Sequence, residues 1–125
     1  MRSDIRSEFL ELCGHIAEWG ERIPAFIGGM SFEEFAGDEV TYLAVWKCVE
    51  VLGEASSKIL RLDDGLDAAY PQLMLRSARS MRNQLTHGYS VVDLGVLWRT
   101  VHSFVPDMVK AARSILEVAE TGRSN

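Results

Sequence analysis

The chain of 125 residues has the length of a single domain, and it can bury most of its apolar surface without disulfides or metals. Its hydrophobic content of 47% is ordinary for a globular protein, and its net charge of −5 argues against a generic nucleic-acid coat protein. The sequence has no signal peptide and no apolar run of about 18 residues, so we expect a cytoplasmic protein with no membrane segment.

Residues 4–27 are expected to form a long amphipathic helix. Apolar residues recur there at alternating spacings of four and three, which places them in one stripe with charge on the other faces. The stripe comprises Ile5, Phe9, Leu12, Ile16, Trp19, Ile23 and Phe26. Gly20 and Pro24 are positions at which this helix can bend or end early. A stripe this regular is typical of a helix that faces the core, not of a cofactor site.

A short helix is expected at residues 32–36. Ser31 and Glu34 have the spacing of a capping box, in which each side chain satisfies a backbone N–H at the start of a helix. Asp38 is then suited to cap the helix that follows, because its carboxylate can accept from the first free backbone N–H groups.

That next helix is expected at residues 39–61. It carries apolar residues on more than one face, which predicts a central position packed from several sides. Gly53 permits close approach of another helix. Glu54 lies beside this largely buried surface, so its charge requires a partner. It is either a paired structural carboxylate or a residue that orients Arg82.

The second half of the chain predicts two more helices. The turn residues Asp63, Asp64 and Gly65 end the first half, and Pro71 opens a third long helix that runs to Gly88. A last helix is expected from residue 93 to about residue 119, capped by Asp93, with Pro106 kinking or breaking it near its middle.

The predicted fold class is all-α, an antiparallel four-helix bundle with one additional short helix. No strand pattern, repeat or low-complexity segment occurs in the sequence. We expect a single domain over residues 1–120 and a polar, frayed tail at 121–125.

Residues 82–89 hold the strongest candidate for chemistry. Arg82 can hold a phosphate through two parallel hydrogen bonds, and His87 belongs to the residue type that exchanges protons near neutral pH. Side chains five apart on a continuous helix point about 140° apart, so the two converge only if the helix ends near His87. Asn83 and Tyr89 add hydrogen-bonding groups. Taken alone the pattern also fits a histidine that bonds a helix-end carbonyl and a solvated arginine.

Charge is distributed unevenly along the chain. Residues 1–70 hold fourteen Asp or Glu against six Lys or Arg, whereas residues 71–125 hold four against seven. The second half is therefore positive by three charges and the first half negative by eight. Arg76, Arg79 and Arg99 accompany Arg82 in the positive half. Such an asymmetry marks either a local anion site or a solvated helix face.

The two cysteines predict neither a disulfide framework nor a metal site. Cys13 and Cys48 both fall in apolar helical patterns, which is typical of small buried side chains in a reducing compartment. Cys13 and His15 lie two apart, but the sequence offers no further ligands near them. We therefore expect no metal and no cofactor.

Three segments resemble the HepT toxin family, within the larger HEPN superfamily of helical ribonuclease domains. They are Ser31-Phe32-Glu33-Glu34-Phe35, Val51-Leu52-Gly53-Glu54-Ala55, and Met81 to Tyr89 followed by Val92-Asp93-Leu94 and Trp98. The third fits the family's Arg-x4-His-x-Tyr signature in full. One departure is Gln72-Leu73-Met74 after Tyr70-Pro71, where the family often shows a second proline and a tryptophan.

The resemblance implies a metal-independent endoribonuclease that acts as the toxin of a toxin–antitoxin pair. Arg82 and His87 would be catalytic in a composite site of a homodimer, and Asn83 would orient a phosphate or His87. The partners implied are an RNA substrate and a nucleotidyltransferase antitoxin encoded next to the gene. That antitoxin would transfer AMP to Tyr89, although spacing alone also fits a tyrosine that merely covers the helix end.

Two other functions remain open from the sequence. The chain could be a non-catalytic HEPN-like module that pairs with a nucleotidyltransferase and binds nucleotide or RNA without cutting it. Alternatively, it could be an interaction domain in which the polar residues at the helix end serve only as caps.

Overall fold

The computed structural model describes residues 1–86 and 93–124, and all regular structure in these ranges is helical. The helices are α1 (Ser3–Ile27), α2 (Phe32–Ala36), α3 (Glu39–Leu62), α4 (Gly65–Ala69), the 3-10 helix η1 (Pro71–Leu73), α5 (Leu75–Thr86), α6 (Leu94–His102) and α7 (Val105–Ser124). The predicted all-α class is confirmed.

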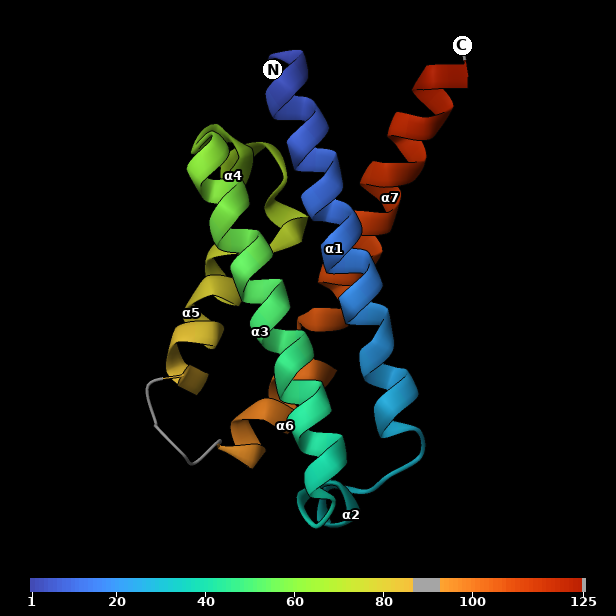
Figure 1. The fold of residues 1–125 in the computed structure, drawn as a ribbon, viewed down its shortest axis with the longest axis vertical. Helices are drawn as coiled ribbons and strands as arrows, with labels where there is room; N and C mark the ends of the chain where they lie inside the picture. Colours follow the sequence, from blue (N-terminus) through green and yellow to red (C-terminus); the bar gives the residue numbers. More distant parts are fainter. Residues whose placement is uncertain (87–92, 125) are drawn as a thin grey trace.

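The long helices run alternately up and down (Figure 1). Helix α1 packs against both α3 and α7, and α3 packs in turn against α5. The chain therefore forms an antiparallel bundle in which α3 is central, as its apolar residues on several faces predicted. Both termini lie at the end of the bundle opposite α2 (Figure 1).

The predicted N-caps are present. Ser31 and Glu34 form the capping box of α2, with Oγ of Ser31 3.2 Å from the backbone N of Glu34. Asp38 accepts from the backbone N–H of Thr41 at 3.0 Å at the start of α3. Asp93 caps α6 in the same way, through the backbone N–H of Val96.

The core of the bundle is almost entirely apolar. Its largest fully buried side chains include Phe9, Ile16, Phe35, Leu52, Ile59, Leu73, Leu75, Leu97 and Met108. Gly20 lets α1 approach α7 closely, since a Cβ added there would lie 2.2 Å from a methyl carbon of Val109. At the α2 end, Trp98 of α6 packs on Phe32 and Phe35, which fixes the short helix against the bundle.

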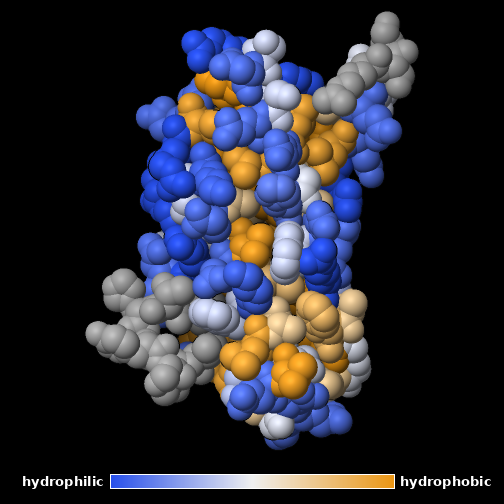
Figure 2. All heavy atoms as spheres, viewed as in Figure 1, coloured by the Kyte–Doolittle hydropathy of each residue, from blue (hydrophilic) through white to orange (hydrophobic). Residues whose placement is uncertain are grey.

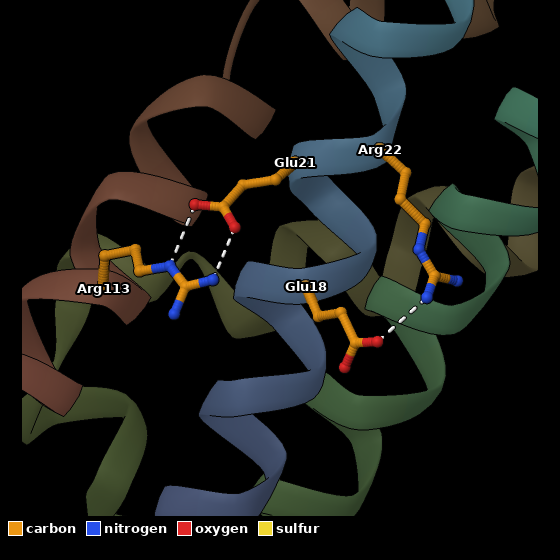
Figure 3. A network of polar contacts seen from close by, with 4 residues as sticks. All are labelled: Glu18, Glu21, Arg22 and Arg113. Atoms are coloured by element: carbon orange, nitrogen blue, oxygen red, sulfur yellow. Dashed lines mark hydrogen bonds and ion pairs between the residues drawn. The ribbon is translucent and has the colours of Figure 1, made fainter.

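An ion pair on the surface joins α1 to α7, and a second lies beside it within α1. Arg113 of α7 donates two hydrogen bonds to the carboxylate of Glu21, as Figure 3 shows. This pairing lowers the pKa of Glu21 and raises that of Arg113. One turn away, Arg22 bonds Glu18 at 2.9 Å and lies over the ring of Trp19. These charged groups are about half exposed, so each ion pair contributes little to stability.

Much of the visible surface is hydrophilic, and hydrophobic side chains show both near the end where α2 lies and near the opposite end (Figure 2). Phe26, Val40 and Leu43 are the exposed large hydrophobic residues of the helix ends near α2. No helix among the described residues is both long enough and apolar enough to cross a membrane.

Three boundaries differ from the prediction. The turn at Asp63–Gly65 leads into a helix, α4, that the sequence did not reveal. Pro71 opens only η1, because Met74 takes a left-handed conformation with φ of 52° and α5 begins after it. The last predicted helix is broken into α6 and α7 just before Pro106, as expected, but α7 continues to Ser124, beyond the end expected at about residue 119.

Candidate active site

Arg82 is positioned by the close packing of α5 on α3. Gly53 of α3 faces it directly, and a Cβ added to Gly53 would lie 2.4 Å from Cβ of Arg82 and 3.0 Å from the carbonyl oxygen of Ala78. No residue other than glycine fits here without moving one of the two helices. Gly53, in the segment Val51 to Ala55 that resembles the HepT family, therefore has a physical role: it lets α5 lie against α3 at Arg82.

Glu54 pairs with Arg82. Its Oε2 lies 3.2 Å from Nη2 of the guanidinium, and the two side chains are 41% and 33% exposed. The two interpretations that the sequence left open thus coincide, because the carboxylate is paired and its partner is Arg82. Partial exposure matters for function, since the guanidinium is held by protein yet remains reachable from solvent.

A pocket of about 190 Å³ opens beside this ion pair, between α1, α3 and α5. This volume is well above the roughly 30 Å³ that one water molecule occupies in the liquid. The residues that line the pocket are Leu12, His15, Lys47, Glu50, Val51, Glu54, Ala55, Lys58 and Arg82. Arg82 thus lines an open hollow rich in charged side chains, which suits a polar or ionic ligand.

The remaining predicted site residues are only partly covered by the structure. Asn83 is exposed on α5 and is absent from the lining of the Arg82 pocket, which fits the turn of about 100° between consecutive residues of a helix. His87, Gly88 and Tyr89 lie outside the described residues. Their predicted roles as catalytic group, helix stop and AMP acceptor remain predictions.

The other two histidines of the chain lie in different pockets. His15 of α1 lines the Arg82 pocket. His102 instead lines a different pocket between α1, α6 and α7, where its Nδ1 lies 2.7 Å from the carbonyl oxygen of Trp98. His15 is therefore the histidine, among the described residues, that shares a pocket with Arg82.

Sequence reasoning missed the α3 side of this pocket. Lys47, Glu50, Glu54 and Lys58 recur at spacings of three and four, which places them in one charged stripe along a helix that is apolar elsewhere. That stripe was visible in the sequence and would have indicated a polar face on α3. It could not have indicated that His15 lies opposite.

The other predicted cations do not converge on Arg82. Arg76 pairs with Asp67 of α4 at 2.7 Å, and neither Arg79 nor Arg99 lines the Arg82 pocket. The positive half of the sequence is thus not one continuous anion site in the described part of the chain.

Both cysteines are free and buried, as predicted. Burial raises the pKa of the Cys13 thiol to about 12, and it also raises that of Cys48. Within residues 1–86 and 93–124, no three histidines, cysteines or carboxylates come close enough together to hold a metal ion.

Comparisons with a family model and with individual relatives agree on one family. A model described as "Ribonuclease HepT-like" matches residues 16–115. "Probable ribonuclease HepT" of Thermococcus cleftensis is 37% identical over 93 residues, covering 74% of this chain and 82% of that protein. "Putative RNase MJ1216" of Methanocaldococcus jannaschii is 31% identical over 105 residues, covering 84% of each. No solved structure matches the chain significantly. Together with the helical bundle that carries Arg82, these matches place the chain in the HepT-like ribonuclease family.

Proposed function

We propose that this chain is a metal-independent endoribonuclease whose charge-stabilising group is Arg82. The observation that carries the proposal is the position of Arg82, held by Glu54 at 3.2 Å and facing an open pocket between three helices. A guanidinium fixed in this way can bind a phosphodiester through two parallel hydrogen bonds. Membership of a ribonuclease family supports RNA as the substrate.

The proposed reaction is attack of an RNA 2′-hydroxyl on the adjacent phosphorus. A bond forms between the 2′-oxygen and phosphorus, and the bond from phosphorus to the 5′-oxygen breaks. A base must accept the 2′ proton, and an acid must supply a proton to the leaving 5′-oxygen. Negative charge collects on the phosphorane between these events, and Arg82 would stabilise it.

His87 is the proposed proton-transfer group, and it requires a second copy of the chain. One imidazole cannot easily act as base and acid at the same moment, whereas a two-fold dimer would bring two copies of Arg82 and His87 to one cleft. One His87 would then accept the 2′ proton while the other protonates the 5′-oxygen. Full cleavage activity by a species that sedimentation identifies as a monomer contradicts this arrangement.

We further propose that the ribonuclease is a toxin, neutralised when a nucleotidyltransferase antitoxin transfers AMP to Tyr89. The modification would add a phosphodiester charge that competes for Arg82, and it would add bulk two residues from His87. Tyr89→Phe is expected to keep ribonuclease activity but to escape covalent neutralisation. Mass spectrometry of the co-expressed pair should locate AMP on a peptide that contains Tyr89.

Tyr42 and Tyr70 serve as internal controls for this modification. Both are partly buried against the core, with Tyr42 in ring contact with Phe35 and Tyr70 with Phe9. AMP found on either of them instead of Tyr89, or full neutralisation of Tyr89→Phe by modification, contradicts the assignment.

Product ends test the chemistry. Cellular RNA incubated with the protein in EDTA should yield fragments that end in 2′,3′-cyclic phosphate, because the attacking 2′-oxygen stays bonded to phosphorus. Strict dependence on added magnesium, or ends that carry a 3′-hydroxyl, would exclude the mechanism.

The alternative is a module that binds nucleotide or RNA without cutting it. It predicts that His87→Ala keeps toxicity and binding. Loss of toxicity in both His87→Ala and Arg82→Ala, with the fold and dimer intact, rules this alternative out.

A further inference from the structure

Charged side chains from three helices surround the pocket next to Arg82. Helix α3 supplies the stripe of Lys47, Glu50, Glu54 and Lys58, and His15 reaches the same pocket from α1. The proposed cleavage reaction uses Arg82, held by Glu54, and gives the other four groups no role. They extend the polar surface from Arg82 along α3.

The ion pairs in this pocket leave an excess of positive charge. Glu50 is bonded by Lys47 at 2.9 Å, and Glu54 is bonded by Arg82 at 3.2 Å, so each carboxylate has its own cation. The side chains of Lys58 and His15 are exposed, and neither has a hydrogen-bond or ion-pair partner among the described residues. Its two lysines and one arginine against two carboxylates give the pocket a formal net charge of +1, in a chain whose net charge is −5.

The lining also indicates what kind of ligand this charge suits. No phenylalanine, tyrosine or tryptophan lines the pocket in the described part of the chain, so it offers no platform on which a base could stack. An ammonium and an imidazole N–H can bind phosphate oxygens, which carry no sequence information. The ligand chemistry that fits is a backbone phosphate.

We propose that the pocket lined by His15, Lys47 and Lys58 is a subsite for an RNA backbone phosphate next to the one cleaved at Arg82. Lys58 is its main cation and His15 donates a hydrogen bond to the same phosphate. The proposal rests on the proposed ribonuclease function for the identity of the polymer. It assigns α1 and α3, and not only α5, to substrate binding, so RNA would lie across the face formed by these three helices.

The test measures binding separately from cleavage. A short single-stranded 2′-O-methyl RNA lacks the attacking hydroxyl, so it binds without being cut. Its affinity is measured by fluorescence anisotropy over a series of salt concentrations for the wild-type protein, Lys58→Gln and His15→Gln. Lys110→Gln is the matched control, because Lys110 is an exposed lysine on α7 outside this pocket.

Each phosphate neutralised on a single strand contributes about 0.7 to the slope of log affinity against log salt concentration. Lys58→Gln should lower the slope by about that amount, so a fourfold rise in salt should weaken the wild type about 2.6-fold more than the variant. His15→Gln should weaken binding with a smaller change in slope. The loss should be the same for oligonucleotides of different sequence, and Lys110→Gln should match the wild type.

If Lys58→Gln binds RNA with the affinity and the salt dependence of the wild type, the proposed subsite is wrong. It is also wrong if Lys110→Gln loses as much RNA affinity as Lys58→Gln, because the loss would then reflect overall charge alone. Cleavage of unmodified RNA is measured with the same preparations. If the wild type cuts RNA but Lys58→Gln binds normally, the subsite is wrong and the proposed function stands. If binding depends on Lys58 but no RNA is cut, the subsite stands and the proposed function fails.

Discussion

Gly53→Ala should displace Arg82 and so test whether the approach of α5 to α3 positions the site. The new Cβ would lie 2.4 Å from Cβ of Arg82, whereas ordinary contacts begin at 3.4 Å. Cβ cannot rotate away from its own backbone, so α5 must move outward by about 1 Å, the difference between these two distances. The carbonyl oxygen of Ala78 at 3.0 Å opposes a smaller adjustment.

Two effects of this substitution on stability oppose each other. Overpacking a helix contact costs about 1–3 kcal/mol, and alanine in place of glycine within a helix returns about 0.5–1 kcal/mol. The net loss is therefore up to about 2.5 kcal/mol, or a fall in Tm of up to about 10 °C for a domain of this size. The effect on catalysis is larger, because a misplacement of about 1 Å can cost roughly 100-fold in rate.

The assay compares thermal unfolding and single-turnover RNA cleavage for Gly53→Ala and a control, Gly14→Ala. A Cβ at Gly14 of α1 would meet no atom within 4 Å, so this control should gain about 0.5–1 kcal/mol of stability and keep its activity. If Gly53→Ala is as stable and as active as the wild type, close packing at this point does not position Arg82.

Two further predictions concern Glu54 and Cys13. Glu54→Gln should lower kcat about tenfold with little change in KM. It should lower the free energy of unfolding by less than about 1 kcal/mol, because a half-exposed ion pair orients Arg82 more than it stabilises the fold. An unchanged kcat would show that Glu54 does not position Arg82. Because the pKa of Cys13 is about 12 when folded and near 9.0 when unfolded, its contribution to stability is complete below pH 9 and declines as the pH rises. Between about pH 9 and 12, the ratio of folded to unfolded protein should thus fall roughly tenfold more per pH unit in the wild type than in Cys13→Ala. Urea unfolding at a series of pH values measures this ratio. If the free energy of unfolding depends on pH in the same way in both proteins, the thiol of Cys13 is not buried and neutral.

The elements that the sequence predicted correctly depend on local chemistry. Helix starts at Ser31, Asp38 and Asp93 follow from side chains that bond backbone groups three residues away. The break before Pro106 likewise follows from a residue that cannot continue a helix. Such features need no knowledge of the rest of the fold.

The elements that the sequence did not predict depend on distant contacts. The left-handed conformation of Met74, which separates η1 from α5, is one that a methionine seldom adopts, and it lies between the fully buried Leu73 and Leu75. Burial of both leucines on either side of the turn accounts for it, and no local pattern reveals that burial. Helix α4 has only five residues, and its N-cap Asp64 belongs to the Asp63–Gly65 segment that was predicted as a turn.

The candidate site divides in the same way. Arg82 and its pairing with Glu54 were anticipated as one of two possibilities, because a carboxylate beside a buried surface needs a cation. The sequence did not predict that His15 shares a pocket with Arg82. This depends on the register between α1 and α3, which packing across many residues determines. Hydrophobic periodicity predicts which face of a helix is buried, but not the axial register at which the neighbouring helix packs against it.

The most direct test of the central claim is the single-turnover rate of RNA cleavage by Arg82→Ala in EDTA, measured beside the wild type. Removing one group that stabilises transition-state charge typically costs about 100-fold to 1,000-fold, and we predict a loss in that range with unfolding temperature and oligomeric state unchanged. A folded Arg82→Ala protein that cleaves RNA at the wild-type rate would show that Arg82 does not stabilise the reacting phosphate.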